Sequence, residues 1–177
     1  MVLDASIYAY STGMRRIILI AHDIRSTHNV GSLLRTADGL GIEKVYFTGY
    51  TPYPSSNSDR RLPHIAQKLH KQIAKTALGA EQSVTWEHRQ DIVALLEELK
   101  AQHYTLLALE QAPAAVTLPA YEPTEKIAIV LGREVEGVDK AILELVDTIV
   151  EIPMFGSKES FNVVQAAAMV MYHCRFA

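Results

Sequence analysis

The amino-acid sequence predicts an α/β fold with a mainly parallel sheet and helices on both of its faces. Apolar runs alternate along the chain with longer segments of helical periodicity, which is the pattern of a parallel sheet. Two of the runs, at 105–109 and 127–131, are apolar almost throughout, as expected of strands that are buried on both sides.

We expect the strands and helices to alternate as follows. The strands are predicted at 16–22, 44–48, 84–87, 104–109, 127–131 and 148–152. The helices are predicted at 29–40, 63–78, 91–102, 138–145 and 160–175. Two segments rich in proline and polar residues, 49–59 and 111–123, are predicted as loops.

Composition narrows the class of protein. A chain of 177 residues with a net charge of −3 fits one globular domain, with no room for a separate substrate-binding module. No apolar run approaches the roughly 20 residues of a membrane helix, and the charges at 15–16 follow the apolar stretch, the wrong order for a secretory signal. The single Cys174 excludes an internal disulfide, and the histidines lack metal-ligand spacing. We therefore expect a cytoplasmic protein without a metal site.

Basic residues gather in one part of this mildly acidic chain. Between 60 and 80 there is no acidic residue, while five residues are basic: Arg60, Arg61, Lys68, Lys71 and Lys75. Such a segment suits a partner that carries phosphates, although a solvated helix face has the same pattern.

The first candidate motif lies at the start of the first predicted helix. Asn29 can cap this helix, and Gly31 allows the close approach of another chain or of a ligand. Arg35 lies among apolar residues, an unusual place for a solvated charge. Either it extends from the helix edge or pairs with an acid, or it takes part in a functional site. The six-residue spacing places Asn29 and Arg35 on different faces, so we expect them to make different contacts.

The second candidate motif, at 131–137, follows a buried strand. Gly132 and Gly137 predict a turn at the carboxyl end of a parallel strand, where α/β sheets bind ligands. Glu134 either meets a cation or hydroxyl there or serves as an acid at a helix N-terminus. The segment is not a phosphate-binding Walker loop, because no Gly-Lys-Ser/Thr sequence follows.

The third candidate motif joins the last strand to the last helix. A glycine-containing loop follows Pro153 and leads to Ser160, a candidate N-cap. The helix after it is apolar on all sides, so it must be buried on all sides, either in the core of its own chain or partly at a subunit interface.

These three motifs together resemble the SpoU/TrmH branch of the SPOUT methyltransferases. The matching segments read NVGSLLRTA at 29–37, LGREVEG at 131–137, IPM at 152–154 and ESFNV at 159–163. The resemblance extends from about residue 16 to residue 172. Two positions depart from the family pattern: Phe161 stands where leucine is usual, and Val164 where a small hydroxyl residue is common.

The resemblance implies a deep C-terminal trefoil knot, an exception to the rule that chains do not thread loops. It also implies a homodimer that binds S-adenosylmethionine in the knotted pocket. By motif matching, the cofactor pocket is lined by Leu109, Glu110, Gly132, Ile152, Met154 and Phe161. The reaction centre is formed by Asn29, Arg35, Glu134, Ser160 and Asn162.

The activity implied is S-adenosylmethionine-dependent RNA methylation, at a ribose 2′-hydroxyl of tRNA or rRNA, by one domain over 1–177 without a separate RNA-binding domain. Methylation of a base nitrogen, a non-catalytic RNA-binding or assembly role, and a flavodoxin-like nucleotide module remain alternatives. Our hypothesis for Arg35 is that it clamps a phosphate and stabilises developing alkoxide charge, because a guanidinium with a pKa of about 12.5–13.8 is a poor base.

Overall fold

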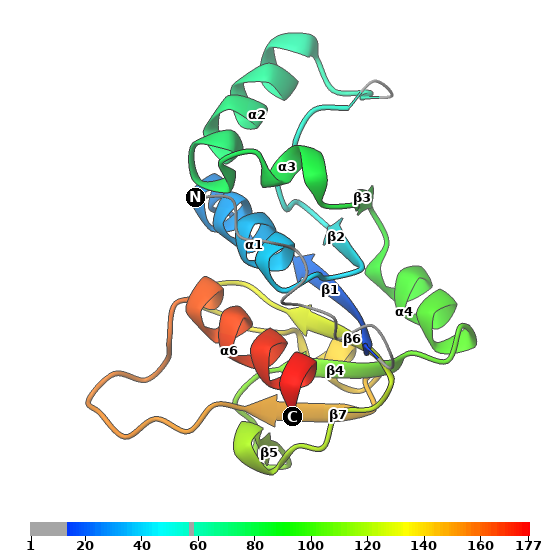
Figure 1. The fold of residues 1–177 in the computed structure, drawn as a ribbon, viewed down its shortest axis with the longest axis vertical. Coiled ribbons are helices and arrows are strands. Elements are labelled where there is room, and N and C mark those ends of the chain that lie inside the picture. The colour runs from blue at the N-terminus through cyan, green and yellow to red at the C-terminus, as the bar shows by residue number, and fades with distance from the viewer. Residues whose placement is uncertain (1–13, 57–58) are drawn as a thin grey trace, which may run out of the picture.

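The computed structural model describes residues 14–56 and 59–177, and Figure 1 shows their arrangement. In this part of the chain, parallel strands form a 7-stranded sheet of order β3-β2-β1-β6-β4-β7-β5. The α/β class is therefore confirmed. The N-terminal stretch used to exclude a secretory signal lies outside the described residues. None of the described helices is long and apolar enough to cross a membrane.

Most of the strands follow the predicted apolar runs. They are β1 (Arg16–His22), β2 (Lys44–Thr48), β3 (Trp86–Arg89), β4 (Thr105–Leu109), β5 (Val116–Thr117), β6 (Lys126–Leu131) and β7 (Thr148–Glu151). The helices are α1 (Thr27–Gly39), α2 (Pro63–Ala77), α3 (Ala80–Ser83), α4 (Ile92–Ala101), α5 (Lys140–Leu143) and α6 (Val163–Phe176), with a 3-10 turn, η2, at Leu118–Ala120.

Helices cover both faces of the sheet, as predicted. Successive residues of β1 point to opposite sides. Ile17 and Leu19 join a core with α1, α2 and α6, whereas Ile18 and Ile20 join a second core with α4 and α5. Burial on both sides explains why β1 and β6 are apolar along most of their length.

The centre of the sheet is the place where its connections change direction. β1 and β6 are neighbours, with Ile20 paired to Val130, but the chain runs from β1 outward to β2 and from β6 outward to β7 on the other side. Crevices at the carboxyl ends of such strands are the usual ligand sites of open α/β sheets.

Gly31 lets α1 and α2 pack closely. A Cβ atom at this position would lie 2.2 Å from the carbonyl oxygen of Ile73 and 2.2 Å from the hydroxyl of Thr76. That hydroxyl donates a 2.9 Å hydrogen bond to the carbonyl of His28. The close approach that the sequence indicated is therefore made by a helix of the same chain.

Both predicted helix caps were wrong. The Ser26 side chain, not Asn29, caps α1 by accepting from the backbone N–H of Asn29 at 3.2 Å, so the helix begins two residues earlier. At α6 the cap is Asn162, not Ser160: its Oδ1 accepts from the N–H of Val164 at 2.9 Å. In each case another polar residue near the helix start binds the free N–H groups.

Three other elements differ from the predictions. The helix expected at 138–145 is reduced to the four residues of α5. The strand expected at 84–87 starts at Trp86, because the short helix α3 ends at Ser83 and Val84 is its C-cap. The loop expected at 111–123 contains β5, which adds only two residues to the edge of the sheet. These elements are too short to give a periodic signal.

Candidate functional site

The loop after β6 is built around two glycines. Gly137, with φ +72°, closes a turn in which Arg133 and Gly137 exchange backbone hydrogen bonds of 3.0 and 3.1 Å. A Cβ atom at Gly132 would lie 2.3 Å from the carbonyl of Gly137, so only glycine fits there. The turn predicted at the carboxyl end of β6 is therefore present.

Glu134 joins this loop to the start of α1. Its carboxylate accepts from the backbone N–H groups of Arg25 and Ser26, both at 3.3 Å, and from the side-chain amide of Asn29 at 3.1 Å. Burial alone would raise the pKa of Glu134, but these bonds and one from its own backbone N–H lower it on balance. Glu134 is thus an acid at a helix N-terminus, but the helix is α1 and not the one that follows it.

A cavity of about 270 Å³ opens beside this loop, at the carboxyl ends of β4, β6 and β7. The six residues expected to hold the cofactor all line it: Leu109, Glu110, Gly132, Ile152, Met154 and Phe161. The Glu110 carboxylate links the segment after β4 to the loop after β6, because it accepts hydrogen bonds from the backbone N–H groups of Gln111 at 2.8 Å and Val138 at 2.7 Å.

The five residues expected at the reaction centre are only partly brought together. Glu134 and Ser160 line the cavity, and Asn29 is bonded to Glu134. Asn162 is exposed and caps α6 beyond Ser160. Arg35 lies on the exposed side of α1, outside the cavity lining.

Asn29 and Arg35 make different contacts, as their spacing indicated. Asn29 faces the loop of Glu134. Within the described part of the chain, the Arg35 guanidinium makes neither a hydrogen bond nor an ion pair. An exposed arginine in the middle of a motif, with all five donors unused, is available to a group from outside this chain.

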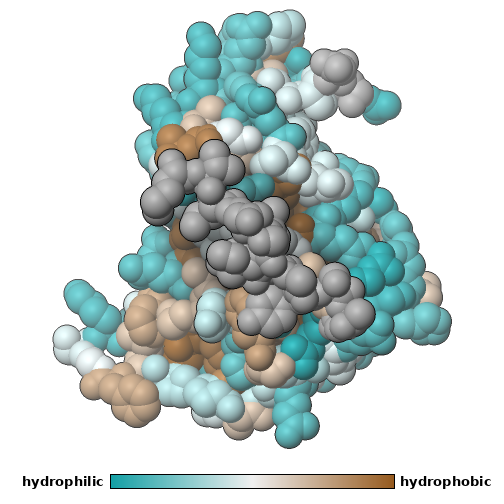
Figure 2. Space-filling model, in the orientation of Figure 1, coloured by the Kyte–Doolittle hydropathy of each residue, from teal (hydrophilic) through white to brown (hydrophobic). Residues whose placement is uncertain are grey.

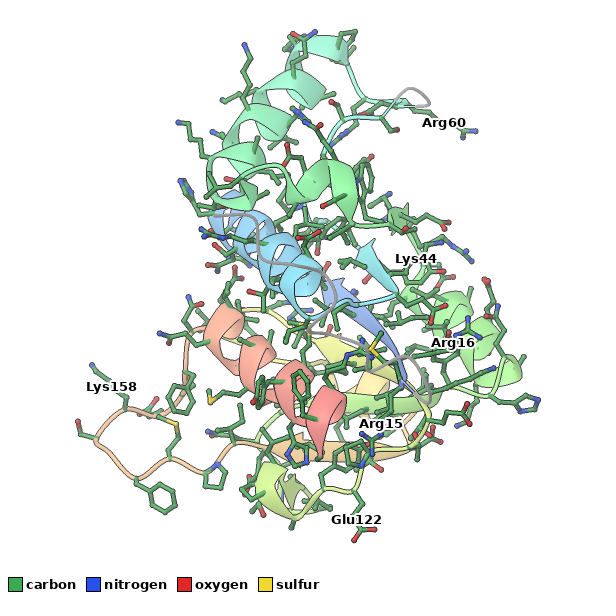
Figure 3. All side chains as sticks on the ribbon, viewed as in Figure 1. Arg15, Arg16, Lys44, Arg60, Glu122 and Lys158 are labelled. Carbon is green, nitrogen blue, oxygen red and sulfur yellow. The ribbon has the colours of Figure 1, made fainter. Side chains whose placement is uncertain are left out.

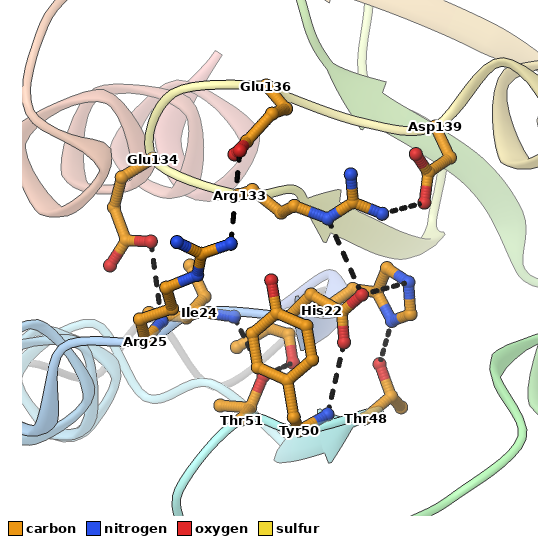
Figure 4. A network of polar contacts seen from close by, with 12 residues as sticks. His22, Ile24, Arg25, Thr48, Tyr50, Thr51, Arg133, Glu134, Glu136 and Asp139 are labelled. Atoms are coloured by element: carbon orange, nitrogen blue, oxygen red, sulfur yellow. Dashed lines mark hydrogen bonds and ion pairs between the residues drawn. The ribbon is translucent and has the colours of Figure 1, made fainter.

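A polar network between the ends of β1, β2 and β6 was not expected from the sequence (Figure 4). Arg133 binds Asp139 at 2.5 Å and lies 3.6 Å from Asp23, which accepts from the N–H of Tyr50 at 3.0 Å. Asp23 has φ +56°, an uncommon backbone for a residue other than glycine. The sequence did contain one signal for this network, since Asp23 is an acidic residue directly after the buried strand β1.

The same network contains the only group of potential metal ligands found among the described residues, His22, Asp23 and Asp139. Arg133 lies against both carboxylates and supplies the positive charge that they require. Burial lowers the pKa of His22, so its ring is neutral near pH 7. The Nδ1 atom of this ring lies 2.9 Å from the hydroxyl of Thr48. The geometry is that of an ion-pair network that fixes the loop after β6.

The predicted basic segment divides into two parts. Lys68, Lys71 and Lys75 are exposed on one face of α2, and Arg60 points away from the body of the protein (Figure 3). Arg61 is engaged within its own loop instead. It binds Asp59, whose pKa it lowers to about 2, and donates to the carbonyls of residues 53 and 54, both at 3.0 Å.

Comparison with known proteins agrees with the motifs. The SpoU rRNA methylase family model matches residues 16–172. The chain is 28% identical over 162 residues to the 23S rRNA (guanosine(2553)-2′-O)-methyltransferase of Bacillus subtilis, covering 90% of this chain and 58% of that one. It therefore spans about three-fifths of the length of this relative.

Solved structures share the fold. The SpoU methyltransferase AviRb of Streptomyces viridochromogenes, in complex with AdoMet, superposes with a TM-score of 0.72 at 20% identity, covering 91% of this chain and 57% of that one. A protein described with the 2-OH methylation of C/U34 on tRNA superposes with a TM-score of 0.70 at 19% identity, covering 90% of this chain and 94% of that one. With its motifs, its sheet and this match from β1 to α6, the chain belongs to the SpoU rRNA methylase family.

Proposed function

We propose that the protein is an S-adenosylmethionine-dependent RNA methyltransferase that modifies a ribose 2′-hydroxyl of tRNA or rRNA. One observation carries the proposal: the cavity at the carboxyl ends of β4, β6 and β7 lies next to the Glu134–Asn29 bond. Three sequence motifs that lie far apart in the chain thereby meet at one place. The relatives act on rRNA and tRNA, which supports both substrate classes. We also propose a cytoplasmic location.

The cavity suits a cationic methyl donor. Its volume of about 270 Å³ is close to the lower end of the roughly 300–1,000 Å³ typical of small-molecule sites. Five glutamates and one arginine line it, a charge that favours a sulfonium. Leu109, Ile152 and Met154 give it an apolar wall for the adenine ring. When bound, S-adenosylmethionine would supply an activated methyl group for an in-line displacement.

The chain's own residues would position the acceptor. The Glu134 carboxylate fixes the Asn29 amide, whose oxygen is left to accept from a ribose hydroxyl. Arg35 would bind an RNA phosphate through its planar fork and stabilise charge that develops on the ribose oxygen. Its exposure and unused donors support this role over that of a buried base.

We further propose a homodimer, in which Arg35 of one subunit completes the site of the other. The outer side of α6 carries exposed apolar residues, with Tyr172 60% and Phe176 54% exposed. Apolar residues gather over α6 in Figure 2. A stripe of this kind on the terminal helix is typical of a subunit interface. The C-terminal knot remains a prediction, as does the assignment of the whole chain to one domain.

Two measurements test the activity. Calorimetry with S-adenosylmethionine should show stoichiometric binding. Incubation with total RNA and a methyl-labelled donor should give nucleosides whose label is on the ribose, identified by mass spectrometry after digestion. A methylated base would overturn the ribose assignment. Absence of donor binding would favour a non-catalytic RNA-binding role.

The dimer is tested separately by sedimentation. Tyr172→Glu places a charge in the exposed stripe of α6 and should give monomers. Val93→Glu is the matched control, because Val93 is 41% exposed on α4 in the opposite helix layer. A wild-type chain that sediments as a monomer would contradict the proposal.

A further inference from the structure

A second concave surface lies on the other side of the Glu134–Asn29 bond. It is an open groove of about 470 Å³ at the carboxyl ends of β2 and β3, bounded on one side by the start of α1. No residue expected to bind the cofactor lines it. We call it the β2–β3 groove; the residues used below are Arg25, Tyr50, Tyr53, Arg61, His88 and Gln90.

The floor of the groove is rigid. The Tyr53 ring stacks on His88 with centroids 4.2 Å apart, and the Arg61 guanidinium covers it at 3.6 Å. Arg61 is in turn fixed by Asp59 and by two backbone carbonyls. Both faces of Tyr53 are therefore occupied, so this ring shapes the groove and does not itself offer a stacking surface.

Tyr50 supplies the free aromatic surface. It is 50% exposed, and its backbone is held by the 3.0 Å bond to Asp23. The Arg25 guanidinium lies 5.8 Å from the centre of its ring. A fixed backbone, an exposed ring and an adjacent cation form a platform on which single-stranded nucleic acids stack their bases.

The remaining polar groups suit the edge of a base. Among the described residues, the exposed Gln90 amide makes no hydrogen bond, so it offers a donor and an acceptor. In the part of the chain that the structure describes, the lining contains two arginines and no acid. A phosphate-bearing ligand therefore meets no like charge within the groove.

The groove is also correctly placed for the substrate. Arg25 connects it to the proposed reaction centre, because the Arg25 N–H donates to Glu134 at 3.3 Å and its guanidinium lies 3.9 Å from Glu136. Figure 4 shows the Tyr50 ring rising from the end of β2 toward the loop of Arg133 and Glu136. The donor cavity and the groove thus flank the same pair of motifs.

We infer that the β2–β3 groove binds an unpaired nucleobase of the RNA substrate, stacked on Tyr50 and contacted at its edge by Gln90. The inference rests on the proposed function, because it identifies the substrate of that site as single-stranded RNA, such as a loop, and not a duplex. Proteins read RNA sequence mainly from such unstacked bases. The groove is then the element that selects the nucleotide.

The test measures RNA binding without methyl transfer. A short single-stranded RNA of mixed sequence containing 4-thiouridine is bound to the full chain, and photo-crosslinked peptides are identified. Crosslinks are expected at 49–53 and 86–90. Tyr50→Ala should weaken binding of this RNA roughly 5- to 150-fold, the range for loss of one base-stacking contact. Tyr50→Phe keeps the ring and should restore most of the affinity.

The outcomes separate the groove from the proposed function. Crosslinks confined to other segments, or wild-type affinity in Tyr50→Ala, would overturn the groove even if the enzyme methylates RNA. Crosslinks at Tyr50 in a chain that does not bind S-adenosylmethionine would support the groove and overturn the proposed function. If total RNA is methylated, Gln90→Ala should raise KM more than it lowers kcat, as expected for a residue that binds the substrate away from the reacting atoms.

Discussion

The donor cavity and the β2–β3 groove lie at the same edge of the sheet but are lined by different charged side chains. Counted over residues 14–56 and 59–177, the cavity is lined by five glutamates and one arginine, whereas the groove is lined by two arginines and no acid. Glycine loops and apolar side chains form the cavity, and aromatic rings form much of the groove. The boundary between them lies at the carboxyl ends of β1 and β6, where Glu134 joins the loop after β6 to the start of α1.

This difference indicates how one small sheet would keep two ligands apart. An acidic cavity attracts a sulfonium and repels RNA phosphates, while the exposed Arg25 of the groove can bind a phosphate. The two ligands would meet only at the boundary, beside Asn29 and Glu134.

Gly132→Ala should disable the cavity and spare the groove. The added Cβ atom would lie 2.3 Å from the backbone of Gly137, so the loop after β6 must move. We expect methyl transfer to fall about 100-fold or more, the cost that a shift of about 1 Å can have. Calorimetry with S-adenosylmethionine should show weakened binding, with the affinity for single-stranded RNA retained. Gly39→Ala is the control, since a Cβ atom there meets nothing within 4 Å.

Variants of Arg35 test the proposed contact between this side chain and an RNA phosphate at the reaction centre. Arg35→Ala should lower kcat roughly 100- to 1,000-fold, as for loss of one group that stabilises developing charge. The free energy of unfolding should change by less than about 0.5 kcal/mol, because the side chain is exposed and has no partner among the described residues. Arg35→Lys, which keeps the charge but lacks the bidentate fork, should remain strongly impaired. Near-normal turnover in Arg35→Lys would contradict the phosphate clamp.

Glu134→Gln tests the hydrogen bonds that join the loop after β6 to the start of α1. We expect a loss of about 1–2 kcal/mol of stability at pH 7, since charge-assisted hydrogen bonds are replaced at a partly exposed site. The pKa of Glu134 is lowered in the folded protein. Its contribution is therefore complete above the unfolded pKa of about 4.3 and is lost as the pH falls through the folded pKa. Urea unfolding of both proteins should show their difference shrinking below about pH 4. A difference that stays constant with pH would assign the effect to shape and not to charge.

The sequence predicted the layers of the fold better than its polar contacts. Strands β1, β2 and β6 lie within one residue of their predicted bounds, because burial on both faces leaves long apolar runs. Helix starts were less predictable, because Ser26 and Asn29 are both good caps. Ser26 caps α1, and the Asn29 amide instead binds Glu134, which is more than 100 residues away in the sequence.

The cavity was predictable and the groove was not. The residue pattern alone indicated Gly132 at the end of a buried strand, and the resemblance supplied Ile152, Met154 and Phe161, so motif matching identified one edge of the sheet. The groove combines Tyr50, Tyr53 and His88 from a loop and a strand that share no motif. Nothing in local periodicity shows that Tyr53 stacks on His88, or that Arg61 covers the ring from its other side.

The basic face of α2 gives the smallest expected effect and the clearest contrast with the groove. Replacing Lys68, Lys71 and Lys75 by Gln should reduce the slope of log affinity against log salt by up to about 2, since each phosphate contact on a single strand contributes roughly 0.7. Lys100→Gln is the control, because Lys100 lies on α4, in the opposite helix layer. Stacking releases no counterions, so Tyr50→Ala should lower affinity at every salt concentration and leave the slope unchanged. In a plot of log affinity against log salt, the triple lysine variant should therefore change the slope, and Tyr50→Ala should change only the intercept. An unchanged slope in the triple variant would remove α2 from the RNA site and leave Arg25 and Arg35 as the main positive charges that meet the substrate.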